Sequence, residues 1–160
     1  MMLKSGGVLL AIALALGGGA AIASAQERET IVNVDPADAA MNAAKAKAIA
    51  TLADFYARLA APGSGESQFM IKFDILPGDD AEFVWANDLQ RSGGSMTGIL
   101  INQPAYTDDK LGDRVGIAEA DIIDWAYFRG KVLQGGYTNR VLLTLLPPDQ
   151  AEALRRNFGW

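Results

Sequence analysis

The chain has 160 residues, no cysteine and no histidine, with 14 lysine and arginine residues against 19 aspartate and glutamate residues. This length suits one domain, or one domain with a tail. The missing cysteines exclude disulfides and a cysteine nucleophile, and the missing histidines exclude histidine-dependent catalytic triads and imidazole metal sites. An acidic chain with scattered basic residues is also a poor nucleic-acid binder, because phosphate contacts need a concentrated positive face.

The first 25 residues have the pattern of an export signal. Lys4 gives a short positive region, residues 8–16 are an apolar run, and Ala23-Ser24-Ala25 has the small-x-small spacing that signal peptidase recognises. We expect cleavage between Ala25 and Gln26. The mature protein would then be exported: periplasmic in a Gram-negative source and secreted otherwise.

An uncleaved membrane anchor is the alternative, because residues 5–26 carry no charge. A membrane-spanning helix needs about 20 predominantly apolar residues. This segment contains three consecutive glycines and only a short strongly apolar run, so cleavage is favoured. We therefore expect the chain to meet the membrane only transiently, through the signal peptide.

Residues 26–66 are expected to form a lead-in, a helix and a linker. Asp35 fits the N-cap of a helix, and Pro36 fits its first position. Apolar residues then recur every three or four positions as far as Ala61, which predicts one amphipathic helix of about seven turns. Packing of its apolar stripe on its own domain is a simpler interpretation than a partner-binding face. Pro62-Gly63-Ser64-Gly65 ends the helix.

From Gln68 the hydrophobic period changes to two, which is typical of strands. Residues 69–75, 82–87 and 95–101 predict three strands joined by short turns. Short connections indicate antiparallel pairing, because parallel strands need long crossovers. A polar loop begins at Asn102 and runs through Lys110.

The C-terminal part predicts further strands and a last helix. Residues 111–117 fit a turn that leads into a fourth strand, and residues 125–134 fit a hairpin turning at Arg129-Gly130-Lys131. Residues 139–146 are apolar and ambiguous between strand and helix, whereas residues 150–157 fit a short helix.

The predicted fold class is therefore α+β. A long N-terminal helix would pack on a twisted antiparallel sheet of four to six strands, either open or curled toward a small barrel, followed by a short C-terminal helix. Residues 67–160 would form the sheet domain, and the helix of residues 35–66 would complete it as a single domain.

No standard catalytic or metal-binding motif is present. Gly93-Gly94-Ser95-Met96-Thr97 lacks the last glycine of a serine-hydrolase elbow, and the residues around Gly130-Lys131 do not form a phosphate loop. Asp79-Asp80 and Asp108-Asp109 are more typical of solvated turns than of a metal site. We expect no cofactor and no metal. An enzyme that uses two carboxylates stays open, because their spacing is spatial and not sequential.

Six pieces of sequence, in order between about residues 40 and 146, resemble the DUF2314 domain, a bacterial family of undefined function. They are Phe69, Ile71, Lys72 and Phe73; Glu82 to Trp85; Gly98, Leu100, Asn102 and Pro104; Leu111, Gly112, Asp113 and Val115; Ile122, Asp124 and Trp125; and Gly135 to Thr138 with Arg140. Phe83 stands where the family usually has a histidine. The resemblance implies a small α+β domain and no established activity.

The same residues have a structural and a functional interpretation. Trp85 and Trp125 are expected to fill the core, with indole N–H groups that need acceptors. In the structural interpretation, Asp124 and Arg140 form a charge pair beneath Tyr137. In the functional one, a polar recognition patch is formed by Asn102, Asp124, Trp125, Tyr137, Thr138 and Arg140.

These observations predict an exported, non-catalytic binding or interaction module of the cell envelope. Its partner would be a protein or another envelope component. The alternative function is a carboxylate-only hydrolase that acts on an envelope polymer.

Overall fold

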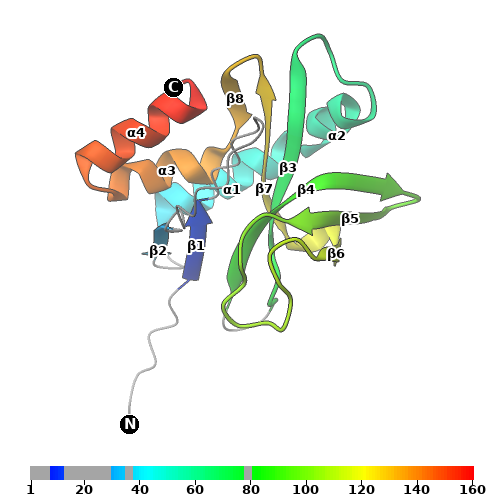
Figure 1. The fold of residues 1–160 in the computed structure, drawn as a ribbon, viewed down its shortest axis with the longest axis horizontal. Helices are drawn as coiled ribbons and strands as arrows, with labels where there is room; N and C mark the ends of the chain where they lie inside the picture. Colours follow the sequence, from blue (N-terminus) through cyan, green and yellow to red (C-terminus); the bar gives the residue numbers. More distant parts are fainter. Residues whose placement is uncertain (1–7, 13–29, 35–37, 78–80) are drawn as a thin grey trace, which may run out of the picture.

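The computed structural model describes residues 8–12, 30–34, 38–77 and 81–160 (Figure 1). Six antiparallel strands form an open sheet in the order β6-β5-β4-β3-β7-β8. The predicted α+β class is confirmed, but the sheet does not close into a barrel. The six strands are β3 (Glu66–Asp74), β4 (Glu82–Ser92), β5 (Ser95–Leu100), β6 (Arg114–Ile117), β7 (Ile122–Arg129) and β8 (Val132–Gly135).

Two N-terminal strands extend this sheet. β1 (Val8–Ile12) pairs antiparallel with β2 (Thr30–Val34) and parallel with the start of β4. β1 lies inside the predicted export signal, so cleavage after Ala25 would remove it. All other residues of that signal lie outside the described residues, and its cleavage stays a prediction. Within the described ranges, no helix is long and apolar enough to cross a membrane.

The single long N-terminal helix was a wrong prediction: α1 (Ala39–Ala50) and α2 (Leu52–Ala60) are separate helices. Asp35 and Pro36 lie outside the described residues, and the N-cap is Asp38, which accepts a hydrogen bond from the Met41 N–H at 2.7 Å. The break falls at Thr51, which has φ −112° and ψ 9°.

Two side chains donate hydrogen bonds to backbone carbonyls at the break. The Thr51 hydroxyl donates to the Lys47 carbonyl at 2.9 Å, and a threonine that bonds its own backbone in this way tends to disrupt a helix. The Trp125 indole N–H donates to the Ala48 carbonyl at 3.0 Å. The acceptor that Trp125 needs is therefore the end of α1, where the helix ladder stops.

Apolar side chains fill both faces of the sheet. One cluster includes Met70, Phe83 and Trp85 and packs against the C-terminal helices α3 (Tyr137–Leu145) and α4 (Pro148–Phe158). The other includes neighbouring strand residues such as Ile71 and Val84 and packs against α1 and α2. Adjacent strand residues point to opposite faces, so both alternating sets are buried.

The ambiguous segment at residues 139–146 is helical as far as Leu145, where α3 ends, and the predicted last helix is present as α4. The entry to α3 needs two glycines. Gly135 and Gly136 have φ of 71° and 61°, and a Cβ at Gly135 would lie 2.2 Å from the Trp125 carbonyl oxygen. Glycine is required there because a side chain would collide with β7. A short 3₁₀ turn, Glu119–Asp121, precedes β7.

Candidate functional site

A row of polar and aromatic side chains crosses the middle of the sheet. Lys72 on β3 pairs in register with Trp85 on β4 and with Asp124 on β7. All three side chains are buried, with Lys72 and Asp124 fully enclosed. The start of α3 covers this row and contributes the buried Thr138 and Asn139.

Asp124 holds the first turn of α3. One carboxylate oxygen accepts the Tyr137 N–H at 3.2 Å, and the other accepts the N–H and the hydroxyl of Thr138, both at 2.7 Å. A strand residue therefore fills the role of a helix N-cap and satisfies donors that the helix itself leaves unpaired. Burial raises the pKa of the Asp124 carboxyl, and the hydrogen bonds from Thr138 oppose that shift.

Lys72 is the buried lysine of the row. Its Nζ lies 3.4 Å from the Thr138 hydroxyl and 3.5 Å from the Asn139 side-chain oxygen, and it sits 5.4 Å above the Trp85 ring centre. Burial lowers the pKa of Lys72 to about 7, against a smaller opposing effect of the Asp124 charge. The Trp85 indole N–H meets no acceptor among the described residues.

The predicted ion pair between Asp124 and Arg140 was wrong. Arg140 makes no ion pair within the described part of the chain, and its guanidinium lies over the Trp160 ring, 3.7 Å from the centre. The donors that reach Asp124 come instead from the backbone and hydroxyl of α3. Arg140 is consequently exposed at the surface.

The predicted recognition patch is divided by the structure. Five of its residues lie around the start of α3: Asp124, Trp125, Tyr137, Thr138 and Arg140. Asp124 and Thr138 are buried, whereas the Tyr137 ring is half-buried and meets the Trp125 ring edge-on at 5.6 Å. Only Tyr137 and Arg140 therefore offer substantial accessible surface, and their binding role stays a prediction.

Asn102, the sixth residue, belongs to a different feature, the loop between β5 and β6. Its side-chain oxygen accepts the backbone N–H of Trp85 at 2.7 Å. We call residues 101–113 the β5–β6 loop. Its length without regular structure is unusual for a connection between paired strands, and long loops are often binding elements.

Side chains hold the β5–β6 loop in place. The Glu82 carboxylate, buried at the start of β4, accepts the N–H groups of Ala105 and Tyr106. Across the loop, the Gln103 side chain donates to the Asp109 carbonyl at 3.2 Å and accepts the Leu111 N–H at 3.1 Å. Glu82 is more than 20 residues away from the N–H groups that it binds. Together these hydrogen bonds fix the loop, although it lacks the regular backbone pairing of a sheet.

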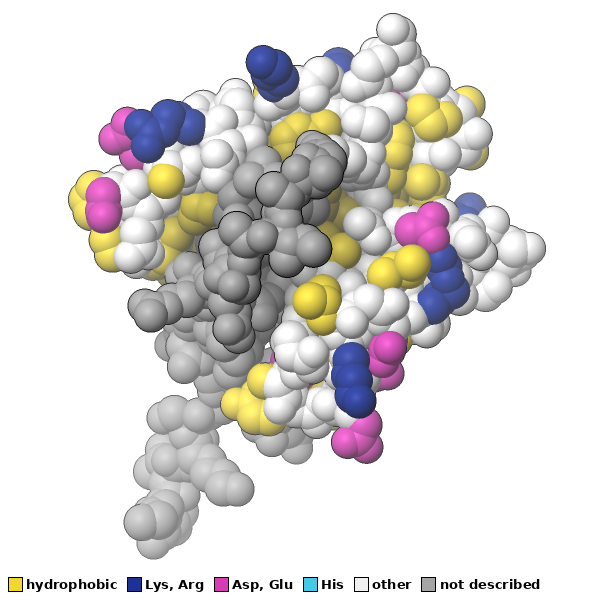
Figure 2. Space-filling view, in the orientation of Figure 1, with side chains coloured by type: hydrophobic (Ala, Val, Ile, Leu, Met, Phe, Trp, Pro, Cys, Tyr) yellow, Lys and Arg dark blue, Asp and Glu magenta, His cyan; other side chains and the backbone are white. Residues whose placement is uncertain are grey.

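The fixed loop exposes two large apolar side chains. Tyr106 is 62% exposed and Leu111 is 60% exposed, the highest values among the large hydrophobic residues whose exposure is described. Asp108 and Lys110 are exposed beside them. Figure 2 shows hydrophobic and charged side chains side by side at the foot of the molecule, where Figure 1 places this loop. Sequence reasoning treated this segment only as polar, although it contains Tyr106 and Leu111.

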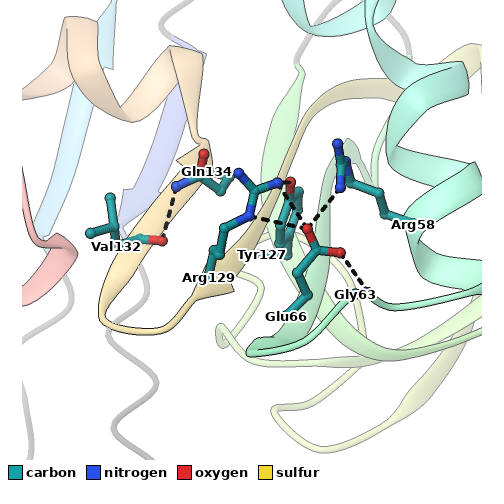
Figure 3. A network of polar contacts seen from close by, with 7 residues as sticks. All are labelled: Arg58, Gly63, Glu66, Tyr127, Arg129, Val132 and Gln134. Atoms are coloured by element: carbon teal, nitrogen blue, oxygen red, sulfur yellow. Dashed lines mark hydrogen bonds and ion pairs between the residues drawn. The ribbon is translucent and has the colours of Figure 1, made fainter.

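A third polar cluster fastens the beginning of β3 (Figure 3). Glu66 accepts hydrogen bonds from Arg58 of α2 at 2.8 Å, from Arg129 of β7 at 2.8 and 3.1 Å, and from the Gly63 N–H at 2.9 Å. The Gly63 N–H is the main cause that lowers the pKa of Glu66, followed by the Arg129 hydrogen bonds. Arg129 also donates to the Tyr127 hydroxyl at 3.0 Å. This cluster joins α2 to the sheet.

Comparison with known proteins assigns the family. The model of the family described as "Uncharacterized protein conserved in bacteria (DUF2314)" matches residues 38–160. The chain belongs to the DUF2314 family. It is also 35% identical over 88 residues to the Escherichia coli K12 protein named "Uncharacterized protein YegJ", an overlap of 54% of this chain and 58% of YegJ. No solved structure matches the chain.

In this DUF2314 domain three acids accept hydrogen bonds from backbone N–H groups. Asp124 binds N–H groups of α3, Glu82 binds those of the β5–β6 loop, and the Asp74 carboxylate accepts the N–H groups of Leu76 and of Glu82 itself. Carboxylates with these bonds are positioned to order the chain. No group of acids that could hold a metal ion occurs among the described residues.

Proposed function

We propose that the protein is an exported, non-catalytic interaction module of the cell envelope that docks a partner protein through the β5–β6 loop. The observation that carries the proposal is that this loop has an ordered backbone and yet exposes two large apolar side chains. Tyr106 and Leu111 are about three-fifths exposed on a loop whose backbone is held by Glu82, Asn102 and Gln103.

The physical argument rests on the cost of binding. A flexible loop loses conformational freedom when it docks, whereas a loop that is already ordered avoids that cost. Tyrosine is a favoured interface anchor, because it offers a large contact area and one polar tip. Exposed Tyr106 and Leu111 with charged residues between them have the composition of a small apolar contact with a polar rim.

The proposal includes export, which rests on the signal pattern of residues 1–25. Intact mass spectrometry of the protein recovered from the periplasmic or secreted fraction tests this part. We expect a mass that begins at Gln26. A protein that keeps residues 1–25 and stays in the membrane fraction would contradict export by cleavage and support the anchor.

The docking part is tested by affinity capture from envelope extract with quantitative mass spectrometry. The double variant Tyr106→Ser/Leu111→Ser should lose a protein that the unchanged chain enriches. Val132→Ser/Leu145→Ser is the matched control, because it removes two exposed apolar side chains from β8 and α3. Equal enrichment by both double variants would contradict docking through the loop.

The hydrolase alternative stays a prediction that receives less support. Asp74 and Asp124 both have pKa values raised by burial, which is a property of catalytic acids. Each of them, however, already accepts hydrogen bonds from backbone N–H groups. Their bonding favours a structural role for both acids.

A further inference from the structure

A second surface, around the start of α3, carries an arginine, Arg140, that forms no direct ion pair with any described carboxylate, although the buried Asp124 charge acts on it. Among the arginines of the described residues, five form ion pairs with carboxylates, whereas Arg140 and Arg155 do not. The five paired residues are Arg58, Arg91, Arg114, Arg129 and Arg156. An unpaired arginine is notable in a chain with an excess of acids.

Arg140 is unpaired but firmly placed. The central carbon of its guanidinium, Cζ, lies over the Trp160 ring, 3.7 Å from the ring centre. The Trp160 indole N–H in turn donates to the Leu133 carbonyl at 2.9 Å, which fixes the ring against β8. Stacking on an aromatic face leaves the in-plane N–H donors of a guanidinium available for a planar or tetrahedral anion.

Tyr137 joins Arg140 to a second cation. Tyr137 and Arg140 lie three residues apart on α3 and therefore share one face of that helix, and Lys47 of α1 lies over the Tyr137 ring, with its Nζ 5.1 Å from the centre. Lys47 is exposed and makes no ion pair within the described residues. The Tyr137 hydroxyl makes no hydrogen bond with any described residue, so it remains a donor.

The base of this surface is rigid. The Tyr137 N–H is bonded to Asp124, and the Tyr137 ring rests edge-on against Trp125. Because Asp124 satisfies the first N–H groups of α3, the backbone there is not the anion-binding element. The available donors are the side chains of Lys47, Tyr137 and Arg140, which come from two helices.

We propose that Lys47, Tyr137 and Arg140 form a binding site for a phosphate or carboxylate group of an envelope molecule. Arg140 provides the paired donors, Lys47 provides a mobile point charge, and the Tyr137 hydroxyl completes the set. This site is separate from the β5–β6 loop, so the test of anion binding does not depend on the outcome of the docking test.

The test uses the protein as it is recovered from the cell and two probes that carry the same chemistry. Inorganic phosphate is titrated while the NMR signals of Tyr137 and Arg140 are followed. Vesicles of phosphatidylglycerol in phosphatidylcholine are used in co-sedimentation, with pure phosphatidylcholine as the neutral comparison. Binding of free phosphate identifies a soluble or polymer-borne anion, and binding only of the charged vesicles identifies a lipid headgroup.

Lys47→Gln/Arg140→Gln should weaken the binding of the effective probe at least tenfold. Lys131→Gln/Arg155→Gln is the matched control: it removes the same charge from two other exposed positions and should leave binding within about twofold. A urea midpoint for each variant separates lost binding from lost folding. The proposal is overturned if neither probe binds, or if both double variants weaken binding equally, since that would indicate only the net charge of the chain.

Discussion

Two irregular segments of this domain, a loop and the start of a helix, are held in the same way. In each, a buried carboxylate on a strand accepts hydrogen bonds from backbone N–H groups of the segment. Glu82 of β4 holds the β5–β6 loop, and Asp124 of β7 holds the start of α3. Both acids lie more than ten residues from the N–H groups of the segment that they hold. Each replaces regular backbone pairing at a place where the chain changes direction.

The two segments differ in what surrounds the carboxylate. Asp124 lies in the centre of the sheet beside Lys72, so two buried ionisable side chains lie together there. Glu82 lies at the end of β4, and the loop that it holds turns Tyr106 and Leu111 into solvent. The comparison shows that one bonding pattern can serve stability in the interior and presentation at the surface.

Replacing Asp124 with alanine should have the largest effect on stability. The change leaves the N–H of Thr138 and its hydroxyl without an acceptor and removes the negative charge nearest to Lys72. Urea denaturation should show a loss of about 3–5 kcal/mol. Asp54→Ala, at an exposed position of α2, should change stability by less than about 0.5 kcal/mol. A loss below about 1 kcal/mol for Asp124→Ala would contradict the capping role.

Glu82→Gln should have a smaller effect, confined mostly to the loop. The amide keeps one acceptor oxygen, so one of the two loop N–H groups loses its partner, and the bond that remains is no longer charge-assisted. We expect a loss of about 1–3 kcal/mol in urea denaturation. Partner capture by the β5–β6 loop should fall as well. A variant with lower stability and undiminished capture would separate the loop's order from its function.

The pH dependence of stability should report Lys72. The unfolded chain keeps this proton up to a pKa of 10.5, whereas the folded protein releases it at about 7. Between these values the unfolded state binds more protons, so folding becomes more favourable as pH rises. The slope from this group is at most about 1.4 kcal/mol per pH unit. Lys72→Met should flatten the curve between pH 7 and 10, and an unchanged slope would show that Lys72 is not the group responsible.

Arg140→Gln should have the smallest effect on stability. Because Arg140 stacks on Trp160 and does not neutralise Asp124, the change removes one exposed cation–π contact. Calorimetry should show a loss of no more than about 1 kcal/mol. A loss as large as that of Asp124→Ala would contradict this account and would indicate that Arg140 pairs with Asp124.

The sequence predicted the elements that depend on local pattern. Alternation in residues 69–75 and 82–87 correctly indicated strands, and short turns correctly indicated antiparallel pairing. The single helix failed for a tertiary reason. Its hydrophobic period continues through Thr51, but the indole of Trp125, far along the chain, bonds the Ala48 carbonyl where the helix breaks. Periodicity contains no information about that donor.

The site was less predictable, because charge alone does not identify the partner of a charged group. Alternation placed Lys72 on the face opposite the apolar residues of β3, but α3 covers that face and buries the lysine. Asp124 and Arg140 are opposite in charge, yet the carboxylate bonds the helix backbone. The bond from Glu82 to Ala105 and Tyr106 spans more than 20 residues without any local signal.

The most direct test of a preformed docking loop is amide hydrogen exchange in the protein without a partner. The N–H groups of Ala105 and Tyr106 should exchange slowly, because both donate to buried Glu82. In Glu82→Gln their protection should fall by at least tenfold, while that of core amides such as Trp125 changes less. Rapid exchange of both loop amides in the unchanged protein would contradict the account, because it would mean that the loop is not ordered before it binds.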